Sequence, residues 1–330
     1  MASPSRRRAA LRYTGAMLRL LCLLLAVVAW GPAARADTGA VRVGVLAYQG
    51  SERAAQDWEP TLEYLNRTIP EHRFAMIPLD LPGMVLAVAN RQVDFVITNP
   101  GNYVTLEARF AVTRIATVES EPVDSPMAAV GSTVFRRADR TDIATLKDLR
   151  GKSVAAVSTD AFGGFQIAWR EMEEAGVSPF NDLRDLALVG FPMQGVVAAV
   201  RAGAVDAGIV RACLLEELEG QGRAARGEFA VLAERRSAEL PCRLSSRLYP
   251  DWPFARVPHA PRDLARRVAA ALLTMPQADG KAWTAPLDYT SVHELFRTLH
   301  IGPYPRTAPS LDELVRRNWQ WLVAAGAAVL

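Results

Sequence analysis

The sequence predicts an α/β fold in which short buried strands alternate with helices. After residue 40, three apolar, β-branched runs are separated by two helical patterns within about sixty residues, which is the order of two βαβ units. The alternation resumes after residue 150. Because parallel strands are joined by crossover helices, this order predicts mostly parallel sheets flanked by helices. A chain of 330 residues, 50% of them hydrophobic, is long enough for two domains with their own cores.

The first βαβ units are well marked by their residue patterns. The helix expected over residues 53–69 carries an apolar stripe, formed by Trp58, Leu62, Leu65 and Ile69. Proline ends this helix, and another proline begins the next. The expected strands here are 41–47, 74–78 and 95–98, and the second helix is 82–90.

Residues 94–103 form the stretch around which the rest of the chain is organised. A buried strand stops at Asn-Pro-Gly, and a helical pattern opens directly after it. Thr98, Asn99 and Tyr103 are therefore expected at the carboxyl end of a strand, beside the free N–H groups of a helix. Anionic ligands bind at such places in open α/β sheets. An ordinary strand–turn–helix corner is the alternative.

A second corner of the same kind is expected at residues 158–164, which are polar and rich in glycine. Glycines allow backbone N–H groups to approach a ligand closely. Further strands are predicted over 115–119, 127–135, 154–157, 186–189, 205–210 and 229–232. Further helices are predicted over 166–175, 194–202, 211–219, 261–273 and 291–299, with a helical turn at 146–149 and a rigid turn at 249–253.

The first 36 residues have the pattern of a secretory signal peptide. Five arginines precede or enter an apolar run, and Ala34-Arg35-Ala36 fits a cleavage site. A retained membrane anchor is the alternative. Six of the 38 basic residues lie in this segment, and none of the 35 acidic residues does. Removing the segment therefore changes the net charge from +3 for the full chain to −3 for the mature chain. No basic tract suggests nucleic-acid binding, and export to the periplasm is expected.

The apolar residues at the C-terminus, within 316–330, have two interpretations. They form either a helix docked on a core or the truncated entry of a membrane helix, since about twenty residues are needed to span a bilayer. Two arginines followed by two tryptophans favour membrane contact at this end.

Several motifs resemble the type II periplasmic solute-binding proteins, in particular the branch that binds phosphate, phosphite and phosphonate for ABC importers. They are the first strand, Leu146-x-Asp-Leu-x-Gly-Lys with its following strand, and Ala199-Val-x-x-Gly-x-Val-Asp-Ala. The resemblance implies two α/β lobes joined by two crossovers that close on a small-molecule oxyanion. Lobe one is expected to comprise 40–120 plus 245–315, and lobe two 121–244.

A closer resemblance is to the periplasmic sensor domain of tetrathionate-type sensor histidine kinases. Its motifs are Asp94-Phe-Val-Ile-Thr-Asn-Pro, Asp160-Ala-Phe-Gly-Gly-Phe-Gln, Arg247-Leu-Tyr-Pro-Asp-Trp-Pro and Ile301-Gly-Pro-Tyr. No kinase or ATP-binding segment is recognised in this sequence. The implied function is the substrate-binding component of an ABC importer, with a permease as partner. The alternative is the ligand-sensing module of a two-component system, with a sensor histidine kinase as partner.

The resemblance also implies ligand-binding residues. Ser158 and Thr159 match the first positions of the family's oxyanion-binding corner, with Gly163 following, whereas Asp160 replaces a hydroxyl and is expected to cap the helix. Where relatives carry a His-Glu pair for an amino group, this chain has Met193 and Gln194, which argues against an aminoalkylphosphonate. Gln194 can still form hydrogen bonds, and Asp251 lies near another acidic contact of the family.

Arg211 is the expected cation of the cleft, because a guanidinium can hold an oxyanion with two hydrogen bonds. A surface salt bridge is the alternative. Tyr48 is an expected cleft wall, as is Tyr103, with core packing as the alternative for both. Asp206 is expected to be structural.

Cys213 and Cys242 form a structural disulfide, remain free thiols, or act as a redox pair that suits a sulfur oxyanion. The histidines lack metal-ligand spacing, and no nucleophile elbow or phosphate loop is present. We therefore expect no metal, no cofactor and no enzymatic activity.

Overall fold

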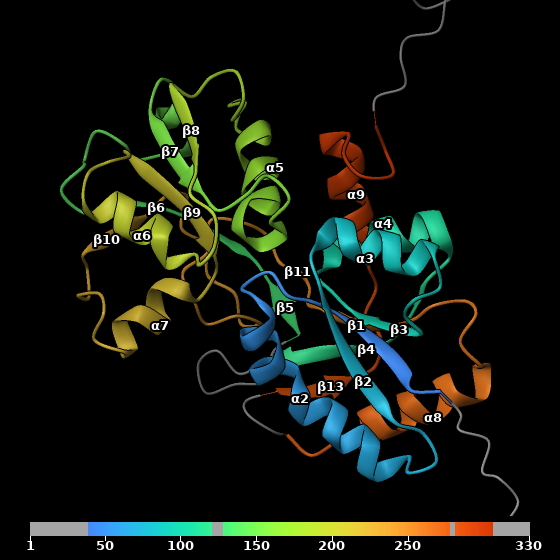
Figure 1. Ribbon diagram of the computed structural model, residues 1–330. Coiled ribbons are helices and arrows are strands. Elements are labelled where there is room, and N and C mark those ends of the chain that lie inside the picture. Colours follow the sequence, from blue (N-terminus) through green and yellow to red (C-terminus); the bar gives the residue numbers. More distant parts are fainter. Residues whose placement is uncertain (1–38, 121–127, 278–280, 306–330) are drawn as a thin grey trace, which may run out of the picture. The chain divides into compact units, whose positions relative to one another are not determined.

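The computed structural model describes residues 39–120, 128–277 and 281–305 (Figure 1). All the elements named below belong to the compact unit that begins at Val41. The predictions for residues 1–36 and 316–330 concern segments outside the described residues. Within those residues, no helix is long and apolar enough to cross a membrane.

The first sheet has six strands in the order β13-β4-β12-β3-β1-β2. Five helices accompany it. The strands are β1 (Val41–Leu46), β2 (Phe74–Leu79), β3 (Phe95–Ile97), β4 (Thr113–Ser120), β12 (Pro253–Arg256) and β13 (Lys281–Thr284). The helices are α2 (Ser51–Thr68), α3 (Leu81–Ala89), α4 (Pro100–Phe110), α8 (Arg262–Leu273) and α9 (Thr290–Leu299).

Both faces of this sheet are buried, because successive side chains of a strand point to opposite faces. In β3, Phe95 and Ile97 pack in one core with α2 and α8, whereas Val96 packs in another core with α3, α4 and α9. The predicted stripe on α2 is buried as expected. The near-continuous apolar runs of the central strands follow from this double covering.

The second sheet has five strands in the order β10-β6-β9-β7-β8. Its core also contains residues of the helices α5, α6 and α7. The strands are β6 (Ser132–Arg137), β7 (Ser153–Ala156), β8 (Asp185–Leu188), β9 (Ala207–Arg211) and β10 (Phe229–Val231). The helices are α5 (Ile167–Glu174), α6 (Gln194–Arg201) and α7 (Leu214–Gly220), with short turns η1 (Leu146–Leu149) and η2 (Phe162–Gln166).

Two chain segments lead from one sheet to the other, and they pair with each other. Strand β5 (Ala129–Val130) precedes the second sheet, and β11 (Tyr249–Pro250) precedes the return to the first. They form an antiparallel two-stranded ribbon in which Val130 faces Tyr249. The prediction of a two-lobe α/β fold with two crossovers is confirmed.

Both sheets are mixed rather than mostly parallel. In the first sheet two neighbouring pairs are parallel and three antiparallel. In the second sheet two are parallel and two antiparallel. The reason is that β12 and β13 in the first sheet, and β6 in the second, run antiparallel to their neighbours. Of these strands, β12 and β13 lack a hydrophobic period, so the sequence did not indicate them, whereas β6 falls largely within the predicted strand 127–135.

Four predicted boundaries were wrong. The strand 127–135 divides at Gly131 into β5 and β6, and the rigid turn at 249–253 contains β11. The helix after the second corner starts at Phe162, not at residue 166, and Arg211 ends β9 instead of starting α7. These last two shifts matter, because they determine how the second sheet presents its candidate ligand-binding residues.

Asp206 is structural, as predicted. Its carboxylate accepts hydrogen bonds from the Ser153 N–H at 2.8 Å and from Arg140 at 2.7 Å. Burial opposes ionisation, but these donors outweigh it and lower the pKa of Asp206 to about 2. The residue therefore ties β7 to the segment before β9.

Candidate functional site

The first corner joins β3 to α4 and is closed by side-chain hydrogen bonds. The Asn102 N–H donates to the Asn99 Oδ1 at 2.8 Å, which makes Asn99 the N-cap, and Pro100 fits the first helical turn. Thr98 is fully buried and its hydroxyl lies 3.1 Å from the Asn102 side-chain oxygen. Asn99 lines a cavity, whereas Thr98 supports the corner from behind.

Tyr103 lies in the core instead of on a cavity wall. It is fully buried, and its ring meets that of Tyr289 edge to face at 5.1 Å. Its hydroxyl donates to Glu107 at 2.7 Å. Burial and this carboxylate raise the pKa of Tyr103 well above its ordinary value. Core packing, the alternative interpretation, is what the structure shows. The sequence pattern was misleading because the first turn of a helix places only some of its residues at the ligand edge.

The second corner joins β7 to the helix that begins with η2. Ser158 and Gly163 line a cavity of about 90 Å³. The first N–H groups of a helix have no acceptor within it, so this end of the helix is suited to an anion. Asp160 does not cap the helix, which has no side-chain cap, and its side chain is exposed.

Two predicted contacts lie elsewhere. Thr159 lines a separate hollow of about 490 Å³, together with Gln166 and Trp169. Gln194 is half-buried at the start of α6, and it lines neither this hollow nor either of the two cavities that contain Tyr48 and Arg211. Its neighbour Met193 reaches the smaller cavity in its place.

The two corners pack against each other at Gly101. A Cβ atom on Gly101 would lie 2.8 Å from the Phe296 ring and 3.1 Å from the Phe162 ring. We expect Gly101→Ala to lower the free energy of unfolding by about 1–3 kcal/mol, the usual cost of overpacking a core. Gly220→Ala is the matched control, because it has open space around it. Urea unfolding of both variants measures the difference, and equal stabilities would contradict this packing.

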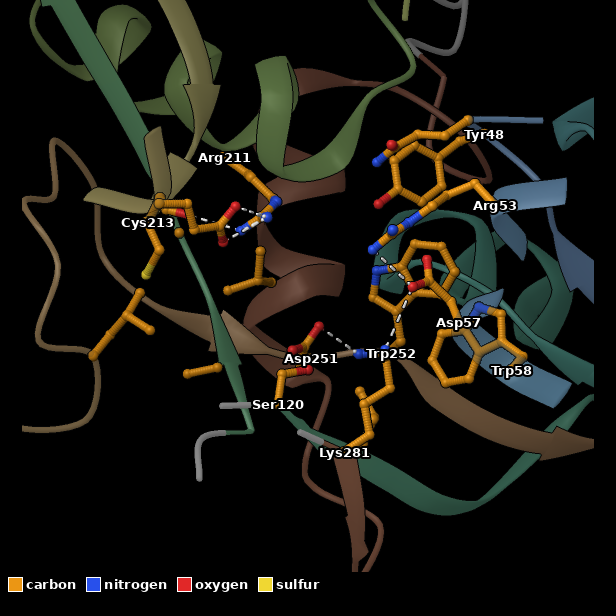
Figure 2. A pocket seen from close by; sticks show the side chains of 18 residues that line it. Tyr48, Arg53, Asp57, Trp58, Ser120, Arg211, Cys213, Asp251, Trp252 and Lys281 are labelled. Atoms are coloured by element: carbon orange, nitrogen blue, oxygen red, sulfur yellow. Dashed lines mark hydrogen bonds and ion pairs between the residues drawn. The ribbon is translucent and has the colours of Figure 1, made fainter. Parts of the chain in front are cut away.

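A larger cavity of about 440 Å³ adjoins the small one. The two share four lining residues, Tyr48, Val130, Arg211 and Trp252. Figure 2 shows the larger cavity, with Arg211 on one side and Arg53 and Asp57 on the other. Tyr48 and Arg211 are therefore accessible from both cavities.

Arg211 is oriented by a carboxylate on the helix that follows it. Its Nη2 donates to both carboxylate oxygens of Glu217, at 2.7 and 2.8 Å, and its Nη1 donates to the Ala212 carbonyl at 3.2 Å. Burial lowers the pKa of the guanidinium, but Glu217 and the nearby Tyr48 outweigh this effect and keep it raised. Arg211 is thus a fixed positive charge at the junction of the two cavities.

Tyr48 stands beside this charge within an aromatic wall. Its ring lies 5.0 Å from that of Phe191, edge to face, and 5.5 Å from that of Trp252. Burial raises the pKa of Tyr48, while Arg211 lowers it. The tyrosine stays protonated at neutral pH, so its hydroxyl can donate a hydrogen bond to an anion.

The opposite wall contains charges that the sequence did not reveal. Arg53 and Lys281 both contact Asp57, at 3.0 and 3.5 Å, and the Lys281 ammonium lies 5.7 Å from the centre of the Trp58 ring. Arg53 and Asp57 have the spacing of an ordinary helix-surface pair. Lys281 comes from β13, a strand that the sequence did not indicate, so no signal linked it to this wall.

Asp251 lies in the same cavity, between β11 and β12. Its Oδ1 accepts the Trp252 N–H at 2.8 Å. Burial raises the pKa of Asp251 to about 7, and the Trp252 N–H, Arg211 and Lys281 offset only part of this effect. The cavity thus holds three basic and three acidic side chains, and it becomes net positive when Asp251 is protonated.

Cys213 and Cys242 form a disulfide with an S–S distance of 2.04 Å. Both residues are buried, with exposed fractions of 2% and 3%. They pack with Leu240 and Leu244, so the bond fixes the start of α7 to the chain returning from the second sheet. Of the three interpretations, the structure shows the disulfide. Within the described residues, no group of three or more metal-ligating side chains is present.

This architecture, with two α/β lobes, two crossovers and charged cavities where the chain passes between them, defines a type II periplasmic binding protein. The family model described as "ABC transporter, phosphonate, periplasmic substrate-binding protein" matches residues 43–297, so the chain belongs to that family. It is a family of periplasmic binding proteins that are not enzymes.

The proteins similar to this chain include a sensor histidine kinase and two binding proteins of known structure. The chain is 35% identical over 293 residues, 88% of its length, to the tetrathionate sensor histidine kinase TtrS of Salmonella typhimurium, and it spans about half (49%) of that protein.

Among solved structures, it resembles PhnD1 from Prochlorococcus marinus in complex with methylphosphonate, with a TM-score of 0.60 and 14% identity over 79% of this chain and 98% of that one. It also resembles a binding protein component of an ABC phosphonate transporter from Pseudomonas aeruginosa. There the TM-score is 0.62, with 12% identity over 85% of this chain and 93% of that one. These two likenesses show the fold.

Proposed function

We propose that this protein binds a small oxyanion, phosphonate-like or sulfur-based, in the cavities that share Tyr48 and Arg211. The observation that carries the proposal is the position of Arg211, a permanently charged fork held by Glu217 at the junction of both cavities. A guanidinium recognises oxyanions through paired, charge-assisted hydrogen bonds.

The surrounding groups support the same class of ligand. Ser158 and Asn99 bring polar side chains to the small cavity, where the second helix also begins. Tyr48 can donate its hydroxyl, and Lys281 adds a positive charge in the larger cavity. An anion can thus exchange its water for donors on several sides, as small-ligand sites require.

The ligand carries no amino group in this proposal. Met193, an apolar side chain, lines the small cavity, and Gln194 lies outside it. The name of the 35% identical relative points to tetrathionate, and a relative of the same fold was solved with methylphosphonate. We therefore place phosphonates without amines and sulfur oxyanions in one test panel.

Calorimetric titration of the mature protein tests the proposal. The panel is methylphosphonate, phosphite, phosphate, thiosulfate and tetrathionate, with 2-aminoethylphosphonate as the amine-bearing comparison. We expect at least one amine-free oxyanion to bind and the aminophosphonate to bind more weakly. If no member of the panel binds, the oxyanion proposal fails.

We also propose that binding closes two lobes, formed by residues 40–120 plus 245–315 and by residues 121–244. Such closure is the usual motion of two-lobe binding proteins. Small-angle X-ray scattering is expected to show a smaller radius of gyration once the bound oxyanion is saturating. An unchanged radius would contradict closure without affecting the binding proposal.

A second candidate function, sensing, is supported by the 35% identity to a sensor histidine kinase. The family description supports delivery to an ABC importer. The two roles differ in their readout. A strain lacking the gene would lose ligand-induced transcription if the protein is a sensor, and it would lose uptake of the radiolabelled ligand if the protein serves an importer.

A further inference from the structure

Asp251 is a half-buried carboxyl for which the oxyanion proposal has no use. A permanently ionised aspartate in an anion site would repel the ligand. Figure 2 shows its carboxyl pointing into the larger cavity. Its only side-chain hydrogen bond among the described residues is the one from the Trp252 N–H at 2.8 Å.

The cations near Asp251 are engaged elsewhere. Arg211 donates to Glu217 at 2.7 and 2.8 Å, while Lys281 contacts Asp57 at 3.5 Å. Within the described residues, no ion pair involves Asp251 itself. Since a carboxylate that is partly withdrawn from water and has no paired cation is destabilised, the neutral acid is favoured in this place.

The remaining charged and titratable groups around the cavity do not supply such a partner. Arg53 faces it from α2 and is paired with Asp57 at 3.0 Å. Tyr48 lines the cavity, and Tyr289 donates its hydroxyl to the Asp251 backbone carbonyl, not to the carboxyl. The cations around Asp251 are thus already paired with other carboxylates, and the tyrosines are neutral donors.

We propose that Asp251 is a specificity-determining residue that binds permanently ionised oxyanions only as the protonated acid, so that binding of such an anion takes up one proton. The proposal rests on the proposed function and deepens it. The protonated carboxyl donates its O–H to the ligand, whereas the ionised carboxylate can only accept. Once ionised, Asp251 favours a ligand that carries its own donor, such as a monoprotonated phosphonate.

The pKa of Asp251 determines the pH range over which binding changes. Burial raises the pKa of Asp251 to about 7. Above that pH, affinity for thiosulfate, which has no proton to gain or lose near neutrality, should fall about tenfold per pH unit until competing electrostatics level it. Below that pH the affinity should be nearly constant.

The sign of the effect on stability is also fixed. A carboxyl whose pKa is raised on folding binds its proton more tightly in the folded state, so it lowers the free energy of unfolding as the pH rises from its ordinary value through about 7. Asp251→Asn, which resembles the neutral acid, should remove this loss. All other ionisable groups are the same in the two proteins, so their contributions cancel in the difference to a first approximation.

The experiment is calorimetric titration of the mature protein with thiosulfate at about pH 6 and pH 8, in buffers of different ionisation enthalpy. We expect uptake approaching one proton per thiosulfate at pH 8 and almost none at pH 6. Asp251→Asn should bind with similar affinity at both pH values and take up no proton. Asp263→Asn, an exposed aspartate on α8 with 90% side-chain exposure, is the matched control and should behave as wild type.

A ligand-free arm separates this inference from the binding proposal. The melting temperature of Asp251→Asn should exceed that of the wild type at pH 8 and approach it at pH 5. Thiosulfate binding without proton uptake, together with parallel melting profiles, would overturn the role of Asp251 and leave oxyanion binding intact. If the melting profiles diverge but no oxyanion binds, Asp251 has a raised pKa without the proposed ligand role, and both proposals fail.

Discussion

Arg211→Gln is expected to weaken oxyanion binding by about 100-fold or more. The guanidinium contributes the charge-assisted donors at the junction of the two cavities, and loss of a charged hydrogen-bond pair costs about 3 kcal/mol or more. Arg211 is half-buried and held by Glu217, so little ordering of the side chain is needed when the ligand arrives. Titration of the variant with the tightest-binding member of the panel measures the effect.

Removing Arg211 alone leaves the Glu217 carboxylate without its partner, which would itself repel an anion. The double variant Arg211→Gln/Glu217→Gln removes this complication, since both charges disappear together. We expect it to bind as weakly as Arg211→Gln or only slightly better. Near wild-type affinity in the double variant would mean that Arg211 does not contact the ligand and that the anion is held elsewhere.

Loss of the disulfide between Cys213 and Cys242 is expected to lower the free energy of unfolding by about 3.5 kcal/mol. The bond closes a loop with a sequence separation of 29 residues. The expected loss of about 3.5 kcal/mol is the conformational entropy that such a cross-link removes from the unfolded chain, multiplied by the temperature. Urea unfolding of Cys213→Ala/Cys242→Ala measures it. Substitution also leaves small buried cavities, which add to the loss.

Reduction provides the control for this prediction. A reductant should lower the stability of the wild type towards that of the double variant, and it should leave the double variant unchanged. If the wild type is equally stable in the presence and absence of reductant, the two cysteines do not stabilise the protein through a bond. A free thiol mapped to Cys213 or Cys242 in the denatured, unreduced wild type would likewise show that the bond is absent.

The strongly periodic parts of the fold were predictable from sequence. Helix α2 follows its Trp58–Leu62–Leu65 stripe, and the central strands follow their β-branched runs, because burial on both faces leaves a clear apolar pattern. The sequence did not predict β12 and β13. A strand of four residues that begins with proline or lysine has no period to detect, and its place in the sheet depends on partners far along the chain.

The candidate site was predictable where it depends on strand ends. Asn99, Ser158, Gly163, Tyr48 and Arg211 all line the joined cavities. Tyr103 and Thr98 turned inward instead. The Tyr103 ring packs against Tyr289 from the first turn of α4, and Thr98, which precedes the N-cap, makes a hydrogen bond to Asn102.

The wall of Arg53, Asp57 and Lys281 could not be found from sequence, since the chain brings together α2 and a strand more than two hundred residues later. Asp251 was noticed only through a family likeness. Its raised pKa follows from its partial withdrawal from water, which is a property of the tertiary structure rather than of the local sequence.

A crystal structure of the mature protein with thiosulfate, or with whichever oxyanion of the panel binds most tightly, tests the central claim most directly. We predict that the anion lies within hydrogen-bonding distance of the Arg211 guanidinium and the Tyr48 hydroxyl, in the space that the two cavities share. An anion bound away from Arg211, with this space filled only by water, would contradict this claim.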